Sequence, residues 1–312
     1  MAINEGLAQA MEKDSRVFLL GQGVKSAWYV GNTCQGLLER FGEKRVIDTP
    51  ISENAVTAAA AGAAIAGLRP VVVHPRMDFM VLAADAIINQ ISNWSYIFGG
   101  KSSVPMVIWP IINRGGEQGA QHSQALQAIF SHIPGLKVIA PSNAYNAKGL
   151  LISAINDDNP VMFLDNRQLY SREDSVPEDM YEIEIGKAKI AKEGSKATVI
   201  AYSSMVEEVL QASEGLDIEI IDLQTIKPWD KKTVFESVKK TGKLLVVDES
   251  WNDFGAAAEL IASVSESCFA FLKKSPKRLC LPNAPAPCAS SLEKEYYLNK
   301  DKIIKEIKNT IL

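Results

Sequence analysis

Two side chains of this sequence have the type and the setting for proton transfer. Glu53 lies directly ahead of an alanine-rich run in DTPISENAVTAAAAGAAIAGLRP, residues 48–70. His122 lies in GGEQGAQHSQALQAIFSHIPG, residues 115–135, where glycines allow a close approach to the backbone. Because an imidazole titrates near neutral pH, His122 is a candidate general acid or base. A hydrogen-bonded structural histidine is the simpler alternative.

Glu53 also has two interpretations. The helix dipole stabilises an acidic residue in a first helical turn by about 0.3 to 1 kcal/mol, whatever else that residue does. The run that follows, from Ala58 to Gly67, is almost entirely alanine and glycine, so little side-chain bulk covers the helix. Such a slim helix allows close packing against another chain, or against a cofactor near the helix start. The second interpretation makes Glu53 a candidate site residue.

Other kinds of site are disfavoured by residue spacing. His74, His122 and His132 form neither H-x-x-x-H nor H-E-x-x-H, so a catalytic zinc site is not expected. The cysteines show no C-x-x-C spacing, which in a long chain without a secretory signal predicts buried free thiols. Neither G-x-G-x-x-G nor G-x-x-x-x-G-K-[ST] occurs, so neither a dinucleotide motif nor an NTP motif is present.

Strand-length and helix-length segments alternate along the chain. Apolar runs predict strands at 16–20, 69–74, 104–109, 136–140 and 160–164. Helices are predicted at 3–13, 53–67, 80–97 and 144–156, with Ser52 capping the second and Ser142 or Asn143 the last. A second alternation has strands near 197–203, 218–223 and 243–250, and helices near 205–214, 231–240, 256–265 and 302–311. This pattern predicts an α/β fold with two doubly wound domains.

A polar, charged stretch without clean periodicity separates the two alternations. We therefore predict a first domain over residues 1–170, a linker over 171–194 and a second domain over 195–312. A length of 312 residues suits two domains of ordinary size.

Composition narrows the function classes. The net charge is -4 and the basic residues are scattered among acidic ones, so we expect no nucleic-acid partner. No apolar run reaches the about 20 residues that span a bilayer, and the amino terminus has no signal-like pattern, so we expect a cytoplasmic protein without a membrane role.

Six motifs, in order along nearly the whole chain, carry a family resemblance. They are RVIDTPISENAV, AAGAAIAGLRPVV, MDFMVLAADAIINQ, GAQHSQALQAIFSHIPGLKVIAPSNAYNAKGLL, AINDDNPVMFL and VKKTGKLLVVDES. Together they resemble the β subunits of thiamine-diphosphate-dependent 2-oxo acid dehydrogenases of the pyruvate, branched-chain and acetoin types, which belong to the transketolase superfamily. The resemblance implies a pyrimidine-binding first domain and a transketolase-type second domain.

The resemblance also assigns roles to residues. Glu53 matches the acid that hydrogen-bonds N1′ of the cofactor's aminopyrimidine and so promotes deprotonation of the thiazolium. Phe79 matches an aromatic residue that packs on the aminopyrimidine, and Pro75 falls in the same cofactor-binding stretch. His122 matches a histidine that assists the bound intermediate or the reductive acylation of lipoyl. A core phenylalanine is the alternative for Phe79.

A third set of residues matches a monovalent-cation loop of the family. These are Met106, Ala154, Ile155, Asp157 and Asn159. Backbone carbonyls supply most ligands in such loops, and the resemblance implies a potassium site. A polar turn at the end of a helix is the alternative.

One expected motif is missing. Thiamine-diphosphate enzymes hold the diphosphate through magnesium bound to a G-D-G motif, and GDG does not occur here. The resemblance therefore implies an α-like partner that carries the magnesium site, in an α2β2-type assembly that could also bind a lipoyl acyltransferase core.

Two alternative functions stay open. The chain could be half of a split transketolase that transfers a C2 or aldehyde unit to a sugar-type acceptor, or a non-catalytic scaffolding subunit. The lead into the MDF motif, VVVHPR, departs from the family's usual acidic and aromatic residues, so the substrate stays open as well. Trp28, Tyr29 and Cys34 border the same region, and structural packing is the simpler interpretation of them.

Overall fold

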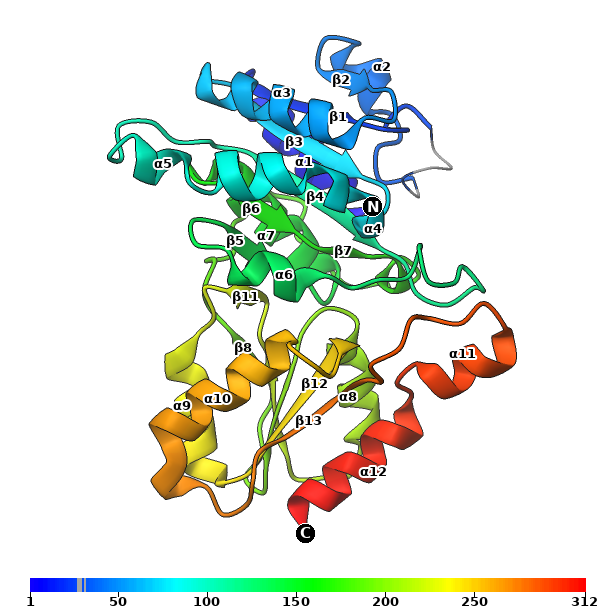
Figure 1. Cartoon of the computed structure of the whole chain (residues 1–312), viewed down its shortest axis with the longest axis vertical. Coiled ribbons are helices and arrows are strands. Elements are labelled where there is room, and N and C mark those ends of the chain that lie inside the picture. The colour runs from blue at the N-terminus through cyan, green and yellow to red at the C-terminus, as the bar shows by residue number, and fades with distance from the viewer. Residues whose placement is uncertain (27–29, 31) are drawn as a thin grey trace. The chain divides into compact units, whose positions relative to one another are not determined.

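The computed structural model describes residues 1–26, 30 and 32–312 (Figure 1), so Trp28 and Tyr29 lie outside the described residues. Contacts divide the chain into two compact units. The first comprises Met1–Asn113 and Ile129–Ile185, and the second Arg114–Ala128 and Gly186–Leu312. The second unit thus includes a segment that lies, in sequence, inside the predicted first domain.

The first unit contains a parallel sheet. Its strands are β1 (Val17–Gly21), β2 (Val46–Asp48), β3 (Arg69–His74), β4 (Val107–Ile112), β5 (Lys137–Ile139) and β6 (Val161–Phe163), with the short β7 (Asp165–Asn166) beside β4. They lie in the order β5-β6-β4-β3-β1-β2, and every neighbouring pair is parallel. Most residues of these strands are buried, as expected for a parallel sheet with helices on both faces.

Helices pack on this sheet. α1 (Ala2–Lys13) and α7 (Ala144–Asn156) pack against each other and form one core with alternate strand residues such as Leu19, Val71 and Trp109. α3 (Glu53–Ile65) packs on β3. Two shorter helices are α2 (Leu37–Phe41) and α6 (Gln127–His132), and a 3-10 turn, η3, spans Arg167–Leu169.

The stretch 80–97 is helical over most of its length, as predicted, but it is not the single α-helix that was expected. That stretch is broken into α4 (Met77–Met80), a 3-10 turn η1 (Val81–Ala83), a π-helical segment η2 (Ala86–Ile91) and α5 (Trp94–Ile97). The Ser92 hydroxyl donates to the carbonyl of Ile87 at 2.7 Å, and the Asn93 amide donates to Ile88 O at 2.9 Å. Side chains that bond carbonyls five residues back compete with the regular α-helical pattern.

The predicted caps have different outcomes. Asn143 caps α7, since its side chain accepts from the backbone N–H of Asn146 at 2.8 Å. Ser52 occupies the N-cap position of α3 but makes no capping hydrogen bond with its side chain. That part of the prediction is wrong, because the φ and ψ of Ser52, -159° and 69°, lie outside the extended conformation typical of a capping residue.

The second unit has its own sheet, in the order β13-β12-β9-β10-β8. The strands are β8 (Lys189–Lys192), β9 (Thr198–Ala201), β10 (Glu219–Asp222), β12 (Leu244–Trp251) and β13 (Lys277–Leu281), and only β8 runs antiparallel to its neighbour. β8, within residues 171–194, and β13 were not predicted. The remaining elements are α8 (Met205–Ala212), β11 (Thr225–Lys227), α9 (Lys231–Thr241), α10 (Ala256–Cys268), η4 (Phe269–Phe271), α11 (Ser290–Tyr296) and α12 (Lys300–Ile311).

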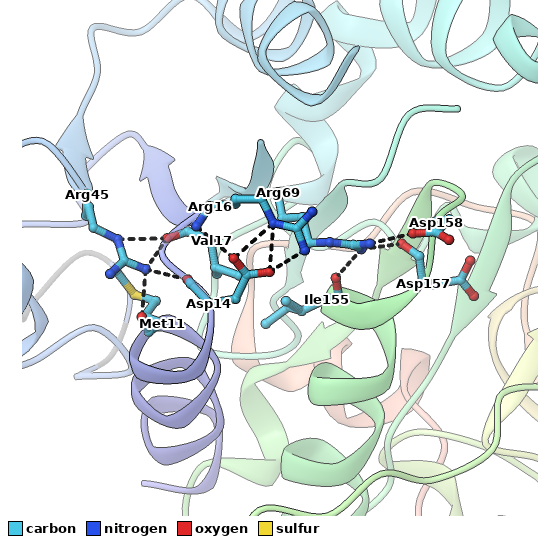
Figure 2. A network of polar contacts seen from close by, with 9 residues as sticks. All are labelled: Met11, Asp14, Arg16, Val17, Arg45, Arg69, Ile155, Asp157 and Asp158. Atoms are coloured by element: carbon cyan, nitrogen blue, oxygen red, sulfur yellow. Dashed lines mark hydrogen bonds and ion pairs between the residues drawn. The ribbon is translucent and has the colours of Figure 1, made fainter. Parts of the chain in front are cut away.

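Arginines close the amino-terminal edge of the first sheet (Figure 2). Arg45 donates to the carbonyls of Met11 and Asp14 at 2.8 and 2.9 Å, where α1 ends, and also to that of Val17. Arg69, the first residue of β3, donates to the carbonyls of Ile155 and Asp157 at 2.9 and 3.0 Å, where α7 ends. These guanidinium groups satisfy helix C-terminal carbonyls. They thereby fix the ends of α1 and α7 at this edge of the sheet.

Among the described residues, no helix combines the length and the apolar character needed to cross a bilayer.

Candidate active site

The carboxyl-terminal edge of the first sheet contains a topological switch point. From β1 the chain passes to β2 on one side, and then returns to β3 on the other side of β1. Open α/β sheets bind ligands where the strand order reverses in this way. The switch point lies between the ends of β1 at Gly21 and of β3 at His74, next to the start of α3.

Two adjoining small hollows lie at this switch point. Both are lined by Gln22 after β1, Glu53 at the start of α3, and His74 and Pro75 at the end of β3. We call these four residues, with the space they line, the Glu53 hollow. Phe79 of α4 also lines it, and this residue is 39% exposed. The structure therefore brings Glu53, Pro75 and Phe79 together.

Gly21 permits the close approach of β1 and β3 beside the Glu53 hollow. Its φ is 153°, and a Cβ placed there would lie 2.5 Å from the carbonyl oxygen of Val73. Any side chain would push the two strands apart, because real Cβ atoms do not approach backbone so closely. A glycine is thus required where the two strands end.

His74 is a site residue that the sequence interpretation missed. Its side chain is buried, and its Nε2 lies 3.2 Å from Oγ1 of Thr57, one turn beyond Glu53 on α3. Burial lowers the pKa of His74 to about 4, so the imidazole is neutral at neutral pH. Its place as the last residue of the predicted strand RPVVVH was the available signal, since ligand-binding residues follow strand ends in this kind of sheet.

Asn113 is a second residue without an assigned role. It follows β4, the neighbour of β3, and is only 2% exposed. Neither its side-chain oxygen nor its side-chain nitrogen has a hydrogen-bond partner within the described part of the chain. A buried amide in this state is expected to bond to a group outside the chain.

His122 belongs to the second unit, in the segment Arg114–Ala128. It is half-buried, and its backbone N–H donates to the carbonyl of Gly119 at 3.4 Å. The neighbouring Ser123 is buried, and its hydroxyl has no partner among the described residues. Glu53 belongs to the first unit, so the two candidate proton-transfer residues are carried by different units.

The candidate potassium residues gather at the turn between α7 and β6, which we call the α7–β6 turn. Arg69 donates to the carbonyls of Ile155 and Asp157, and the Met106 carbonyl accepts from Val161 N–H at 3.0 Å. The Asp157 carboxylate accepts from Asn159 N–H at 2.9 Å and pairs with Lys137, while Ala154 is fully buried. The turn is at the amino-terminal edge of the sheet, opposite the Glu53 hollow, so it is suited to a structural role.

Comparison with known proteins agrees with this architecture. Residues 1–173 match the transketolase pyrimidine-binding domain, and residues 186–303 match the transketolase C-terminal domain. A solved structure described as a split gene transketolase, an inactive β4 tetramer, superposes with a TM-score of 0.81 over 99% of this chain and 97% of that one. At 19% identity, this likeness shows the fold alone.

Curated relatives match over the full chain. The acetoin:2,6-dichlorophenolindophenol oxidoreductase subunit beta of Cupriavidus necator is 40% identical, over 100% of this chain and 96% of the relative. The pyruvate dehydrogenase E1 component subunit beta of Rickettsia felis is also 40% identical, over 98% of this chain and 96% of the relative.

The chain therefore belongs to the transketolase-type family and, within it, to the β subunits of thiamine-diphosphate-dependent 2-oxo acid dehydrogenases. The predicted family and the predicted α/β fold with two transketolase-type domains are confirmed.

Proposed function

We propose that this chain supplies the cofactor-activating half of the active site of a decarboxylating 2-oxo acid dehydrogenase. The observation that carries the proposal is the position of Glu53 at the first turn of α3, in a hollow at the switch point that Phe79 also lines. Thiamine diphosphate, when bound, supplies the electron sink that stabilises a carbanion at the reacting carbon. The chain's own residues would bind and orient it and handle protons.

The residues that line the Glu53 hollow have side chains whose chemistry suits the aminopyrimidine end of the cofactor. Glu53 is half-buried between the strand ends, where its carboxyl group could hydrogen-bond a ring nitrogen. Phe79 presents a partly exposed aromatic face, which suits offset stacking on a flat heterocycle. Pro75 is buried and would form a wall of the binding site.

His122 is the proposed proton carrier at the reacting group. An imidazole on a loop can donate a proton to a carbonyl oxygen that takes up negative charge, or to a thiolate released from a disulfide acceptor, and it can accept a proton from a hydroxyl. The acceptor in the proposal is a lipoyl group on an acyltransferase core.

A partner subunit completes the proposal. The sequence lacks the GDG motif that holds magnesium in thiamine-diphosphate enzymes, so in this proposal an α-type subunit supplies the magnesium and diphosphate site. The exposed face of α3 supports a partner, because it carries Ala55, Ala58, Gly62 and Ile65 with no charge. Exposed Leu82, at 66%, adds apolar area on η1. An α2β2 assembly is the proposed form.

The α7–β6 turn is the proposed potassium site. The charges of Arg69 and Lys137 are balanced by Asp157 and Asp158, and the C-terminal end of α7 adds partial negative charge. Each carbonyl of the turn that accepts a hydrogen bond keeps a second lone pair. A site-specific effect would raise the unfolding midpoint in KCl above that in choline chloride at equal ionic strength. Equal midpoints would remove potassium from the proposal.

Calorimetry tests the half-site. Thiamine diphosphate with magnesium is titrated into the complex co-expressed with its α-type partner, and separately into this chain alone. Tight binding by the complex only is expected. Binding by this chain alone would show that the diphosphate site is misplaced, and no binding by either would favour a scaffolding subunit.

A substrate screen then separates the enzymatic alternatives. The complex is assayed with pyruvate and branched-chain 2-oxo acids, with acetoin, and with ketose phosphates. Decarboxylation of a 2-oxo acid is expected. Turnover of ketose phosphates alone would favour a split transketolase instead.

A further inference from the structure

The segment that carries His122 changes units twice. The chain leaves the first unit after Asn113 and re-enters it at Ile129, and the fifteen residues between belong to the second unit. We call residues 114–128 the His122 loop. Contacts between this loop and residues far along the chain hold it on the second unit.

A buried ion pair holds the start of the His122 loop. Nη1 of Arg114 donates to Oε2 of Glu249 at 2.8 Å, and both side chains are 1% exposed. The same carboxylate oxygen accepts from the Ser204 hydroxyl at 2.9 Å, and the guanidinium lies 4.8 Å from the ring centre of Tyr297. Because each buried charge is costly without the other, the pair strongly resists any movement of Arg114.

Contacts with the stretch 288–293 hold the middle of the loop. The backbone N–H of Glu117 donates to the Glu293 carboxylate at 3.1 Å, and the Glu117 carboxylate accepts from Ser290 N–H at 3.0 Å. Gly119 has a φ of 70°, and a Cβ on it would lie 2.3 Å from Sγ of Cys288. A substituted residue at 119 would therefore have to adopt a strained backbone conformation and displace the Cys288 side chain, three residues before His122.

Gln127 holds the end of the loop. It is fully buried, and its Nε2 donates to the Tyr202 hydroxyl at 3.1 Å and to Asp248 Oδ1 at 3.4 Å. Asp248 also accepts from Ser250 N–H at 2.8 Å and from Ala257 N–H at 3.3 Å, which fixes it against α10. Asp248 and Glu249 are adjacent in β12. The end of this one strand therefore binds both ends of the loop, through Gln127 and Arg114.

We propose that Arg114 and Glu249 are positioning residues, which hold the His122 loop in the conformation that presents His122 to the reacting group. The inference rests on the proposed function of His122 for its kinetic part. The loop geometry itself is independent of that role. Neither residue is assigned to contact substrate or cofactor, so both act through the loop.

A double variant that removes both charges separates the positioning role of the ion pair from its effect on stability. Arg114→Met leaves the Glu249 carboxylate buried without its cationic partner and should lower the unfolding midpoint of the complex markedly. Arg114→Met with Glu249→Gln leaves no charge and keeps an acceptor for Ser204, so the midpoint should largely recover. The matched control is Lys240→Met, which breaks an ion pair with the buried Glu219 carboxylate elsewhere in the second unit.

Hydrogen exchange on the complex reads the loop directly. Amide exchange in residues 114–128 should rise in the double variant and stay unchanged in Lys240→Met. If exchange in the loop is the same in the double variant as in the unmodified complex, the positioning role is overturned.

Kinetics test the link to His122. In the double variant kcat should fall about 10- to 100-fold with little change in the affinity for thiamine diphosphate. His122→Ala should then lower kcat much less in the double variant than in the unmodified complex. A displaced His122 already contributes little to the rate, so removing it changes the rate little. Equal losses in both backgrounds would overturn the inference.

The two proposals fail in different ways. If His122→Ala leaves kcat unchanged in the unmodified complex, the proposed role of His122 is wrong. The kinetic part of the positioning inference then fails with it. If His122→Ala lowers kcat but its effect is the same in the double variant, the role of His122 stands and only the positioning inference fails.

Discussion

Oγ1 of Thr57 lies 3.2 Å from Nε2 of His74, and both side chains are buried. This contact joins α3 to the end of β3, directly beside Glu53. Thr57 brings no negative charge to the ring, so this contact does not offset the cost of burying a protonated imidazole. Burial accordingly lowers the pKa of His74 to about 4.

Acid should therefore destabilise the fold through His74. The unfolded chain binds a proton at its ordinary pKa of about 6.5, whereas the folded chain binds it only near 4, so stability is full above pH 6.5 and is lost as the pH falls. Between pH 7 and pH 5 the His74 contribution falls by about 2 kcal/mol. Urea unfolding at the two pH values, of the unmodified chain and of His74→Gln, measures this contribution to the free energy of unfolding.

The glutamine variant is the control for this prediction. Glutamine keeps a polar partner for Thr57 but does not titrate, so its unfolding free energy should fall less than that of the unmodified chain on acidification. The same fall in both proteins would show that His74 is not the titrating group.

Asp165 should act in the opposite direction. It is buried and accepts from Trp109 Nε1 at 3.0 Å and from the Tyr170 hydroxyl at 2.6 Å, yet burial still raises its pKa to about 6. The folded chain therefore binds this proton more readily than the unfolded chain, and stability rises as the pH falls. Between pH 7 and pH 5 the gain is about 1 kcal/mol. Asp165→Asn should abolish this gain in the same urea experiment, and an unchanged pH profile would contradict the assignment.

The hydrogen bonds from Arg69 to backbone carbonyls should stabilise the fold more than its ion pair with Asp158 does. Arg69→Met removes the donor to the Ile155 and Asp157 carbonyls, and hydrogen bonds from a charged donor contribute about 1.5 to 3 kcal/mol each. Asp158→Asn, the control, breaks only the contact with a carboxylate that is 74% exposed, at a cost of about 1 kcal/mol or less. Equal unfolding free energies for the two variants would show that the carbonyl contacts contribute nothing.

The sequence predicted the parts of the site that local patterns encode. Glu53 is the first residue of α3, as the acid ahead of an alanine-rich run indicated, and Asn143 caps α7. Strand ends follow from apolar runs bounded by polar residues, so β1 and β3 were also found. The roles of Phe79 and Pro75 came from the family resemblance. That both residues lie beside Glu53 could be seen only in the folded structure.

Other features depend on contacts that no short segment records. The membership of residues 114–128 in the second unit is held by Arg114 and Gln127, whose partners in β12 lie 135 and 121 residues along the chain. The helix predicted over 80–97 is interrupted and partly π-helical, because two short polar side chains, Ser92 and Asn93, bond carbonyls within an otherwise apolar pattern. β13 was missed because its sequence, KRLCL, begins with two exposed basic residues at a sheet edge.

Glu53→Gln tests the central residue of the proposal. Glutamine has the size of glutamate but cannot act as a carboxylic acid at a ring nitrogen, so the activity of the complex should fall more than tenfold, a loss above about 1.4 kcal/mol. The loss of helix-dipole stabilisation should be only about 0.3 to 1 kcal/mol, so the chain should stay folded. Rates with a 2-oxo acid and thermal unfolding are measured on the same preparation.

Ser52→Ala is the matched control for Glu53→Gln. Ser52 is adjacent and lines the same hollow, but its side chain makes no capping bond to α3, so the variant should be as stable as the unmodified chain and remain active. An equal loss of activity in both variants would point to disturbance of the helix start rather than to acid chemistry. If Glu53→Gln retained more than about a tenth of the rate, Glu53 would be an N-terminal helix residue stabilised by the dipole and nothing more.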